Sequence, residues 1–337
     1  MKKICTILIL IGMLTIPMLN LNASTINVDK YSEGGLVSAI NQATDGDIIH
    51  LSPGTYTGEN FTNLQIDKKI AIEGDNVIID GEKKNNIFSV KENGYLTLTN
   101  ITIANTHSKY GAGVYNKGHD LSIISCKFIN NHVDSEGAAI YNTGSNNMKI
   151  VDSEFIDNQA KYGGGGALYN DGSNILVKNC NFTNNQAAGA GSIYNYYSAG
   201  NFTILKSNFV NNKGLGSCSC GGAVVNEVSR NMTIYQSFFY NNSACFDGGA
   251  IYNYYGDGFK VYNSIFMGNS AYNSGSAIYS DLSYYGEIIS SRFLSNYIFP
   301  FDERIDDPGV IFLRGTCQIK NLTIIDNNPN DVIYDKL

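Results

Sequence analysis

Carboxylates are the side chains of this sequence best suited to acid–base chemistry. Cleavage of a glycosidic bond needs two carboxylates, or a carboxylate and a basic side chain, on one face of the protein. The densest acidic cluster is Asp152, Glu154 and Asp157. Asp152 and Glu154 are two residues apart, so we expect both to point outward from one strand. Equivalent positions in the neighbouring repeats hold Ser, Lys or Asn, so no second carboxylate completes a pair there.

A second acidic set recurs at one position of a repeat of about 27 residues. Its members, Asp171, Glu227 and Asp281, are separated by Tyr196 and Tyr254 in the intervening copies. Both acidic groups are therefore interpreted as solvated surface charges rather than as an acid/base pair. The sequence predicts no catalytic residue.

The histidines give no sign of a metal or nucleophile site. Such sites need several side chains to converge. The four histidines share no position of the repeat: His50, His107, His119 and His132. We expect no bound metal and no cofactor.

Two cysteines are placed for a disulfide. Cys218 lies three residues before Gly221, and Cys245 lies three residues before Gly248, so they hold equivalent positions in adjacent repeats. Stacked repeats lie about 5 Å apart, which suits a disulfide, and we predict the bond Cys218–Cys245. In the alternative, the loop is displaced and Cys220 pairs instead.

Cys126 and Cys180 share a repeat position that otherwise holds only Ser. A position restricted to small side chains indicates a tightly packed inward site. Two repeats separate these cysteines, so at about 10 Å they cannot bridge. We expect them to be buried thiols.

Tyrosines also recur in one column, which Val225 interrupts. Alternation with inward Ile places these tyrosines on the outer face, and Tyr-Tyr pairs at 196–197, 254–255 and 284–285 lie just beyond. Two interpretations stay open: stacked rings that stabilise the coil, or an aromatic strip that binds glycan or protein. The column consists of Tyr115, Tyr141, Tyr169, Tyr194, Tyr252 and Tyr279.

A Phe-x-x-Asn motif defines the repeat that positions all these side chains. Successive Phe residues are 27, 27, 27, 30, 27 and 27 positions apart. A fixed period of this length is typical of a solenoid or a propeller. In a stacked coil each Asn amide would donate to the next, which predicts a structural ladder. The ladder comprises Asn131, Asn158, Asn185, Asn212, Asn242, Asn269 and Asn296.

A second motif, Gly-Gly-Ala-Ile-Tyr-Asn, recurs at the same period, for example at 248–253. Apolar residues alternate with polar ones between the two motifs, which indicates strands, and no useful helical period appears there. Such a unit cannot bury its own apolar face, so the coils must stack. We therefore predict an all-β fold: a single-stranded right-handed parallel β-helix of about ten coils. A short amphipathic helix at 36–43 is expected to cap its first coil.

The chain divides into three parts. Lys2 and Lys3 precede a short apolar run, which predicts a signal peptide over residues 1–23 and no transmembrane segment in the mature chain. Residues 24–105 should form the cap and the first irregular coils, and residues 106–337 the regular repeats and the end coil. The net charge of −7 disfavours a nucleic-acid partner.

These motifs resemble the repeats of the polymorphic outer-membrane proteins of chlamydiae and of adhesin-like surface proteins of methanogenic archaea. The stretch Gly-Asp-Ile-Ile-His-Leu-Ser-Pro-Gly-Thr-Tyr (46–56) is similar to the opening coils of many such proteins of the pectin-lyase-like group. The resemblance implies a right-handed β-helix that attaches to cells or to surface polysaccharide, and it supplies no catalytic residue.

We therefore expect a secreted or cell-surface, non-catalytic adhesin-like protein whose partner is a surface polysaccharide or protein. One alternative is a polysaccharide lyase or glycosidase of the same fold. The other is a purely structural component of the envelope.

Overall fold

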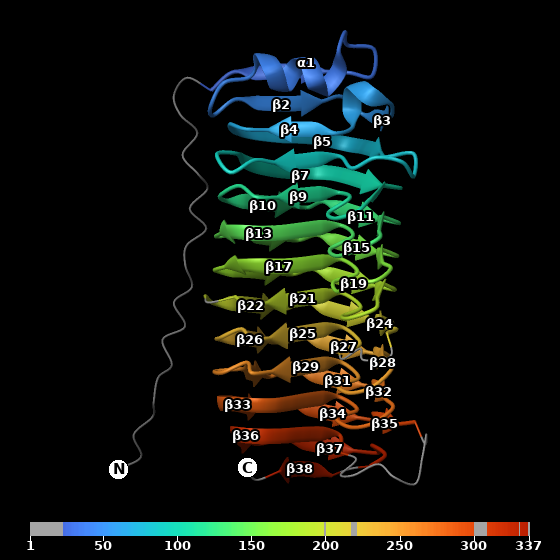
Figure 1. Ribbon diagram of the computed structural model, residues 1–337, viewed down its shortest axis with the longest axis vertical. Helices are drawn as coiled ribbons and strands as arrows, with labels where there is room; N and C mark the ends of the chain where they lie inside the picture. The colour runs from blue at the N-terminus through green and yellow to red at the C-terminus, as the bar shows by residue number, and fades with distance from the viewer. Residues whose placement is uncertain (1–22, 199, 217–220, 300–308, 330, 336–337) are drawn as a thin grey trace, which may run out of the picture.

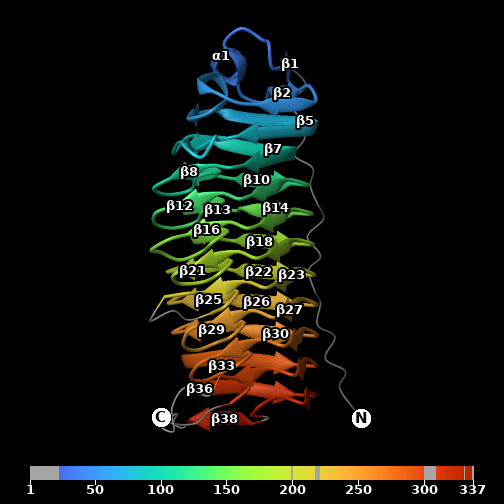
Figure 2. The same cartoon turned by 90° about the vertical axis from the view of Figure 1, so that its right-hand side faces the viewer.

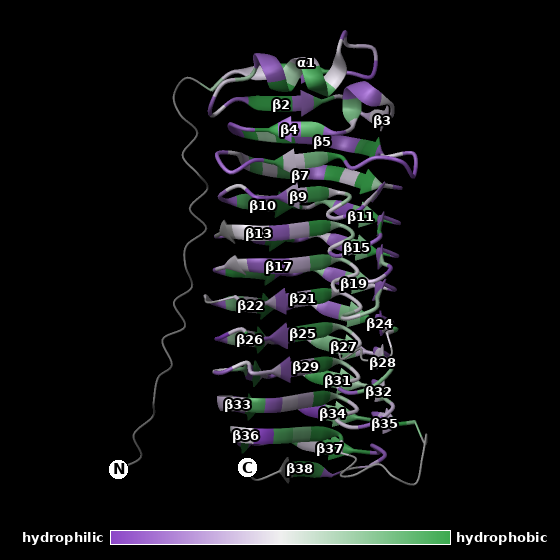
Figure 3. Ribbon diagram, in the orientation of Figure 1, coloured by the Kyte–Doolittle hydropathy of each residue, from purple (hydrophilic) through white to green (hydrophobic). Residues whose placement is uncertain are grey.

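Apolar side chains alternate with polar ones along nearly every strand, and this alternation decides the fold. In β22 (Phe202–Leu205), Phe202 and Ile204 are buried, whereas Thr203 and Leu205 are half-buried. Figure 3 shows hydrophobic and hydrophilic segments alternating along the strands. A strand with one apolar face must cover it, and here each coil covers it by enclosing a shared interior.

The computed structural model describes residues 23–198, 200–216, 221–299, 309–329 and 331–335. The chain winds into a parallel β-solenoid of about 11 turns with about 27 residues per turn (Figures 1 and 2). The predicted fold class is confirmed. The predicted signal peptide falls almost entirely on residues 1–22, outside the described residues, and stays a prediction.

Each regular coil contributes one strand to each of four stacks, in which equivalent strands pair in parallel. The first, named here the tyrosine stack, contains β4 (Leu64–Ile66), β6 (Phe88–Val90), β9 (Val114–Asn116), β13 (Ile140–Asn146), β17 (Leu168–Ser173), β21 (Ile193–Tyr196), β25 (Val224–Glu227), β29 (Ile251–Tyr254), the first parts of β33 (Ile278–Ile289) and β36 (Ile311–Lys320), and β38 (Val332–Asp335).

The second stack follows in each coil and includes the ends of β33 and β36. Its other strands are β1 (Thr25–Val28), β2 (Ile48–Leu51), the starts of β5 (Lys69–Asp80) and β7 (Tyr95–Ala104), β10 (Leu121–Ile124), β14 (Lys149–Val151), β18 (Ile175–Lys178), β22, β26 (Met232–Tyr235) and β30 (Lys260–Tyr262).

The third, the phenylalanine stack, includes the ends of β5 and β7. Its other strands are β3 (Gly54–Tyr56), β11 (Lys127–Ile129), β15 (Glu154–Ile156), β19 (Asn181–Thr183), β23 (Asn208–Val210), β27 (Phe238–Tyr240), β31 (Ile265–Met267), β34 (Arg292–Leu294) and β37 (Thr323–Ile325).

A fourth stack of eight two-residue strands closes the coils between residues 107 and 298, and it was not expected from the sequence. It contains β8 (His107–Ser108), β12 (His132–Val133), β16 (Gln159–Ala160), β20 (Gln186–Ala187), β24 (Lys213–Gly214), β28 (Ser243–Ala244), β32 (Ser270–Ala271) and β35 (Tyr297–Ile298).

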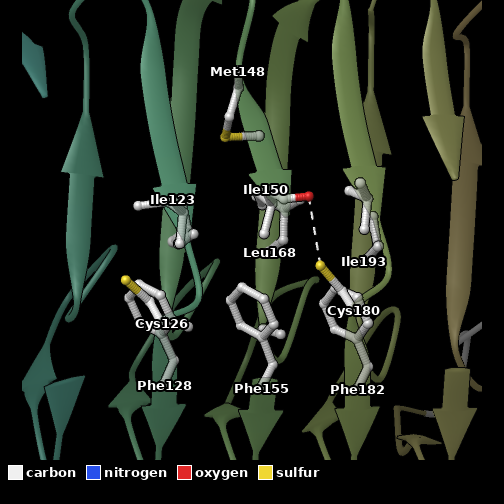
Figure 4. Packing of buried hydrophobic residues seen from close by; sticks show 14 of the residues in the cluster. Ile123, Cys126, Phe128, Met148, Ile150, Phe155, Leu168, Cys180, Phe182 and Ile193 are labelled. Carbon is white, nitrogen blue, oxygen red and sulfur yellow. Dashed lines mark hydrogen bonds between the residues drawn. The ribbon is translucent and has the colours of Figure 1, made fainter. Parts of the chain in front are cut away.

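Identical side chains lie on one another along the core. Phe155 and Phe182 are register partners, and their ring centroids lie 4.7 Å apart with an interplanar angle of 5°. The rings of Phe128, Phe155 and Phe182 stack side by side in three neighbouring coils (Figure 4). The same stacking continues through Phe209, Phe239, Phe266 and Phe293.

All seven asparagines of the Phe-x-x-Asn motif lie in one fully buried column. The Asn158 amide donates to Asn185 Oδ1 at 2.9 Å and to the carbonyl of Phe128 at 3.0 Å. The backbone N–H of Asn158 also donates to Asn185 Oδ1. Every polar atom of such an amide is therefore used, which is what makes its burial tolerable. The column extends at its end to Asn327, which accepts from Asn296.

A second buried asparagine ladder runs through the last position of the Gly-Gly-Ala-Ile-Tyr-Asn motif. Asn116 donates to Asn142 at 2.7 Å, and Asn142 donates to Asn170 at 2.7 Å. It continues through Asn195, Asn226 and Asn253 to Ser280. This ladder was not predicted from the sequence, although the motif that forms it recurs there.

A helix covers the first coil, as predicted. α1 (Gly35–Gln42) buries Leu36, Ala39 and Ile40, and it lies across the end of the solenoid beyond β2 (Figure 1). Lys68 Nζ donates to the carbonyls of Ile40 and Ala43 at 3.1 and 3.0 Å, which satisfies the C-terminal end of the helix. The interior strands of the first coil are thus shielded from water.

At the corner before the tyrosine stack, the backbone turns sharply at a residue in left-handed conformation. Gly248 has φ of +64°, and a Cβ there would lie 2.4 Å from the carbonyl oxygen of Ile251. Only glycine fits such a position, which explains the glycine found there in most repeats. One repeat has Ala190 instead, and its backbone is not left-handed.

Candidate binding grooves on the tyrosine stack

The tyrosine column faces outward and forms two runs of stacked rings. Tyr141 and Tyr169 stack at 4.9 Å, and Tyr252 and Tyr279 stack at 5.1 Å. Val225 is the register partner of both Tyr194 and Tyr252, so it separates the two runs. Tyr115 begins the first run, and Phe312 follows Tyr279 in the second.

A groove of about 700 Å³ lies where Val225 interrupts the column. We name it the tyrosine groove. Its base is formed by the tyrosine column, one side by loops before that column, and the other side by residues two positions further along the strands. Its lining residues are Glu136, Tyr162, Gly163, Gly164, Tyr169, Ala188, Gly189, Tyr194, Tyr196, Gly216, Val225, Glu227, Tyr252 and Tyr254.

Close packing fixes the ring of Tyr194 in this groove. A Cβ on Gly164 would lie 2.1 Å from Cδ2 of Tyr194, so the ring lies directly on the glycine backbone. The phenol of Tyr194 donates to the carboxylate of Glu227 in the next coil. Packing at the ring and a hydrogen bond at the hydroxyl therefore hold one orientation.

The charges in the groove are negative. Glu136 and Glu227 line it, and no lysine or arginine does so among the residues that the structure describes. Burial raises the pKa of the Tyr169 phenol, and the charges of Asp171 and Glu136 raise it further. The Tyr169 phenol therefore stays protonated at neutral pH and can donate a hydrogen bond. An anionic ligand would be repelled here.

The expectation that Asp152 and Glu154 point outward from one strand is wrong. Asp152 has φ of +53° and lies at the bend between β14 and β15, whereas Glu154 begins β15. Glu154 lies 3.2 Å from Lys127 Nζ, and Asp152 accepts from Asn179 at 3.0 Å. Asp and Asn tolerate the left-handed conformation at a corner. The spacing of two residues between Asp152 and Glu154 therefore does not place both on one strand.

The interpretation of Asp281 as a solvated charge is also wrong. Its side chain is 5% exposed, and it pairs with Arg314 in the next coil through two hydrogen bonds. A buried carboxylate needs such a partner. Asp171 is exposed, and Glu227 is half-buried in the tyrosine groove.

Two histidines do share a column, contrary to the expectation. His107 and His132 are register partners in the fourth stack, a stack that was not predicted. His50 lies 3.5 Å from Glu73, and His119 stacks on Tyr95 at 5.0 Å. Among the described residues, no group of three or more His, Cys, Asp or Glu side chains is placed to hold a metal ion.

The cysteines of the core are thiols. Burial raises the pKa of Cys126 to about 11 and that of Cys180 to about 12. Cys180 Sγ donates to the carbonyl of Ile150 at 3.5 Å (Figure 4). Cys218 lies outside the described residues, so the bond to the half-buried Cys245 stays a prediction.

A second groove, of about 620 Å³, lies at the bend after the tyrosine stack, and we name it the corner groove. It is lined by Tyr197, Ser198, Val228, Arg230, Tyr255, Asp257, Leu282 and Tyr284. The two grooves meet at a ridge of perpendicular Tyr pairs, in which Tyr196 and Tyr197 lie 4.9 Å apart. Sequence reasoning missed this groove, although the Tyr-Tyr pairs recurring beyond the column were a signal for it.

The corner holds unusual residues in left-handed conformation. Tyr197, Val228, Tyr255 and Leu282 have φ between +48° and +51° in four consecutive coils. All other described non-glycine residues with positive φ are polar, except the nearby Tyr285. Side chains of this size disfavour the left-handed region, at a cost of about 1–3 kcal/mol each.

Similarity to known proteins extends over the whole solenoid rather than over these grooves. No helix of the described residues is long and apolar enough to span a membrane. Among curated proteins compared by sequence, none matches. The chain is similar in structure to a family PL6 alginate lyase (14% identity, TM-score 0.43), with 90% of this chain but only 40% of the lyase covered.

A polygalacturonase from Erwinia carotovora ssp. carotovora is also similar, with 12% identity, a TM-score of 0.41 and coverage of 93% of this chain and 94% of the enzyme. The A-module of a mannuronan C-5 epimerase from Azotobacter vinelandii shows 11% identity, a TM-score of 0.41 and coverage of 89% and 91%.

Two sequence families match directly. Residues 236–254 and 263–281 match the Chlamydia polymorphic membrane protein repeat, as the resemblance implied. Residues 54–225, just over half of the chain, match the right-handed β-helix region, which also confirms the expected handedness. The chain therefore belongs to the right-handed β-helix family.

Proposed function

We propose that this protein is a secreted or cell-surface adhesin-like β-helix whose tyrosine groove binds an uncharged glycan without turning it over. The observation that carries the proposal is the gap at Val225, which opens a groove lined by six tyrosines in a column that is otherwise closed by stacked rings. A site with rigid aromatic walls and a few polar groups is well suited to a small ligand.

The chemistry of the groove favours sugars. The C–H face of a sugar ring packs on an aromatic ring, while phenol and carboxylate oxygens bind its hydroxyls. Tyr194 and Glu227 are already held by their mutual hydrogen bond, so little side-chain entropy is lost on binding. Because the groove carries carboxylates, we expect neutral glycans to bind better than acidic ones.

The surface location is supported by the match to a repeat named for a polymorphic membrane protein. Such a repeat at 236–254 covers β29, which supplies Tyr252 and Tyr254 to the groove. The matched repeat therefore contributes one edge of the groove, whereas the other lining residues precede residue 236.

A binding screen tests the proposal. The purified chain is applied to an array of neutral and acidic oligosaccharides, and hits are titrated by calorimetry with the variants Tyr169→Ala and Tyr194→Ala. Tyr115→Ala and Tyr279→Ala are matched controls, because these residues stack in the same column but do not line the groove. We expect affinity to fall about tenfold or more in the groove variants alone.

Three results would contradict the proposal. Equal losses in groove and control variants would assign the tyrosines to stability only. Release of shortened oligosaccharides during the titration would make the protein an enzyme, as in the alternative of a lyase or glycosidase. No binding to any array member would favour the purely structural component.

A further inference from the structure

The corner groove has chemistry of its own. It lies around the bend from the tyrosine groove and shares with it only the tyrosine ridge. Tyr197 is 61% exposed and Tyr255 is 49% exposed. These two aromatic side chains lie in the coils on either side of Val228, and both face the solvent. Exposed rings on a fixed corner are ready contact surfaces.

The backbone at this corner indicates a requirement for apolar side chains. Val228 and Leu282 adopt the left-handed conformation that Asn, Asp, Ser and Gly occupy at most other corners. A polar residue would satisfy the turn with less strain. Strained residues persist where the surroundings impose them, and they cluster at ligand sites.

One side chain that lines the groove, Arg230, is positively charged. Arg230 is exposed, and among the described residues its guanidinium makes no hydrogen bond or ion pair, while its backbone N–H donates to Ser198. Asp257 lines the same groove, but its Oδ1 accepts the backbone N–H of Tyr284 at 2.9 Å. Arg230 and Asp257 are not within ion-pair distance, so the guanidinium is available to a ligand.

We propose that the corner groove binds an acidic sugar residue, with the sugar carboxylate on Arg230 and the sugar ring against Tyr197 or Tyr255. A guanidinium binds a carboxylate through two parallel hydrogen bonds, and a solvent-exposed tyrosine ring offers a face for the sugar. This site differs in charge preference from the tyrosine groove, and it stands on different residues, so it does not depend on the function proposed above.

Oligogalacturonate and its methyl ester form the matched ligand pair, because esterification removes the charge and keeps the sugar. Affinities are measured by calorimetry at low and high salt for the unmodified chain and for Arg230→Gln. We expect the unmodified chain to bind the free acid about tenfold more tightly than the ester. Arg230→Gln should bring the two affinities together, whereas Arg292→Gln, an exposed arginine outside the groove, should leave the difference intact.

Further variants separate stacking from charge. Tyr197→Ala and Tyr255→Ala each remove one ring of the groove. The variant that loses the ring in contact with the sugar should weaken both ligands about equally, because the charge on Arg230 is unchanged. Asp257→Asn keeps an oxygen that accepts from Tyr284 but removes a repelling charge, so it should tighten binding of the free acid.

Equal affinity of the unmodified chain for acid and ester, or no binding of either at millimolar concentration, would overturn the proposal. An acidic peptide that competes as well as oligogalacturonate would also overturn it, because the site would then recognise a protein carboxylate. Loss of acid binding in Tyr194→Ala but not in Arg230→Gln would place the ligand in the tyrosine groove instead.

Discussion

Val225 of β25 lies directly beside Tyr252 of β29 in the parallel register, at a position where neighbouring coils place tyrosine on tyrosine. This one side chain opens the tyrosine groove. Val225→Tyr should complete the stack between Tyr194 and Tyr252 and fill the groove. A ring pair of this kind contributes about 0.5–1.5 kcal/mol, so the free energy of unfolding should stay equal or rise while glycan affinity is lost.

Urea unfolding and calorimetric titration on the same preparations measure both effects. Val225→Ile is the control, since it adds no ring and should retain binding. A Val225→Tyr variant that binds as tightly as the parent would show that the ligand lies elsewhere.

The buried asparagine ladder should be the most sensitive part of the core. Asn185→Ala removes the acceptor for the amide and the backbone N–H of Asn158, and the donor to the carbonyl of Phe155. Leaving these buried groups without partners should lower the free energy of unfolding by about 3–5 kcal/mol. Asn181→Ala in the same coil removes an exposed partner of Asn208 and should cost about 0.5 kcal/mol or less. If urea denaturation shows similar decreases in the free energy of unfolding for both variants, the ladder does not stabilise the core as predicted.

The core thiols should be unreactive in the folded protein. Because burial raises the pKa of Cys126 to about 11 and that of Cys180 to about 12, the thiolate is scarcely populated at neutral pH. Iodoacetamide at pH 8 should label neither cysteine until denaturant is added. Rapid labelling of either without denaturant would contradict the burial of these side chains.

The predicted Cys218–Cys245 disulfide is tested by peptide mapping without reduction. A linked pair of peptides containing these residues should appear, lighter than the two free peptides together by two hydrogens. Linked Cys220 and Cys245 would support the alternative in which the loop is displaced.

Stability should fall as pH rises through the titration range of Asp247. Burial raises the pKa of this carboxyl to about 6, with a smaller contribution from Asp281. The folded state therefore binds more protons than the unfolded state between about pH 4 and pH 6, and the free energy of unfolding decreases across this window. Asp247→Asn keeps an acceptor for Asn273 and Ser274, so it should flatten this slope and stabilise the protein at pH 7.

Thermal unfolding at pH 4.5 and pH 7 checks the sign for the parent and for Asp247→Asn. The variant Asp257→Asn serves as the control, because Asp257 lies at the surface bend rather than in the core. A parent that gains stability between these two pH values while the variant behaves identically would contradict the assignment to Asp247.

The solenoid fold could be predicted from the sequence alone, because the same residue types recur at a constant interval: Phe follows Phe and Asn follows Asn. It was insufficient where a corner changes the direction of a side chain. Asp152 and Glu154 are two residues apart, yet Asp152 is the left-handed residue at the bend and only Glu154 belongs to a strand. Contacts between coils were equally hidden, as Arg314 covers Asp281 from 33 positions further along the chain. The tyrosine groove forms where Val225 replaces a tyrosine in the column. The sequence shows this replacement but does not show that it opens a groove.

The regular register has a consequence for length. Every coil in the middle of the stack meets a neighbour that presents the same rings and the same amides, as Phe128, Phe155 and Phe182 do. Removing or duplicating one whole turn therefore leaves two surfaces that still fit each other. The reach of the molecule is an adjustable quantity, set by the count of interchangeable units, while the cap at one end and the grooves on the side keep their own local structure.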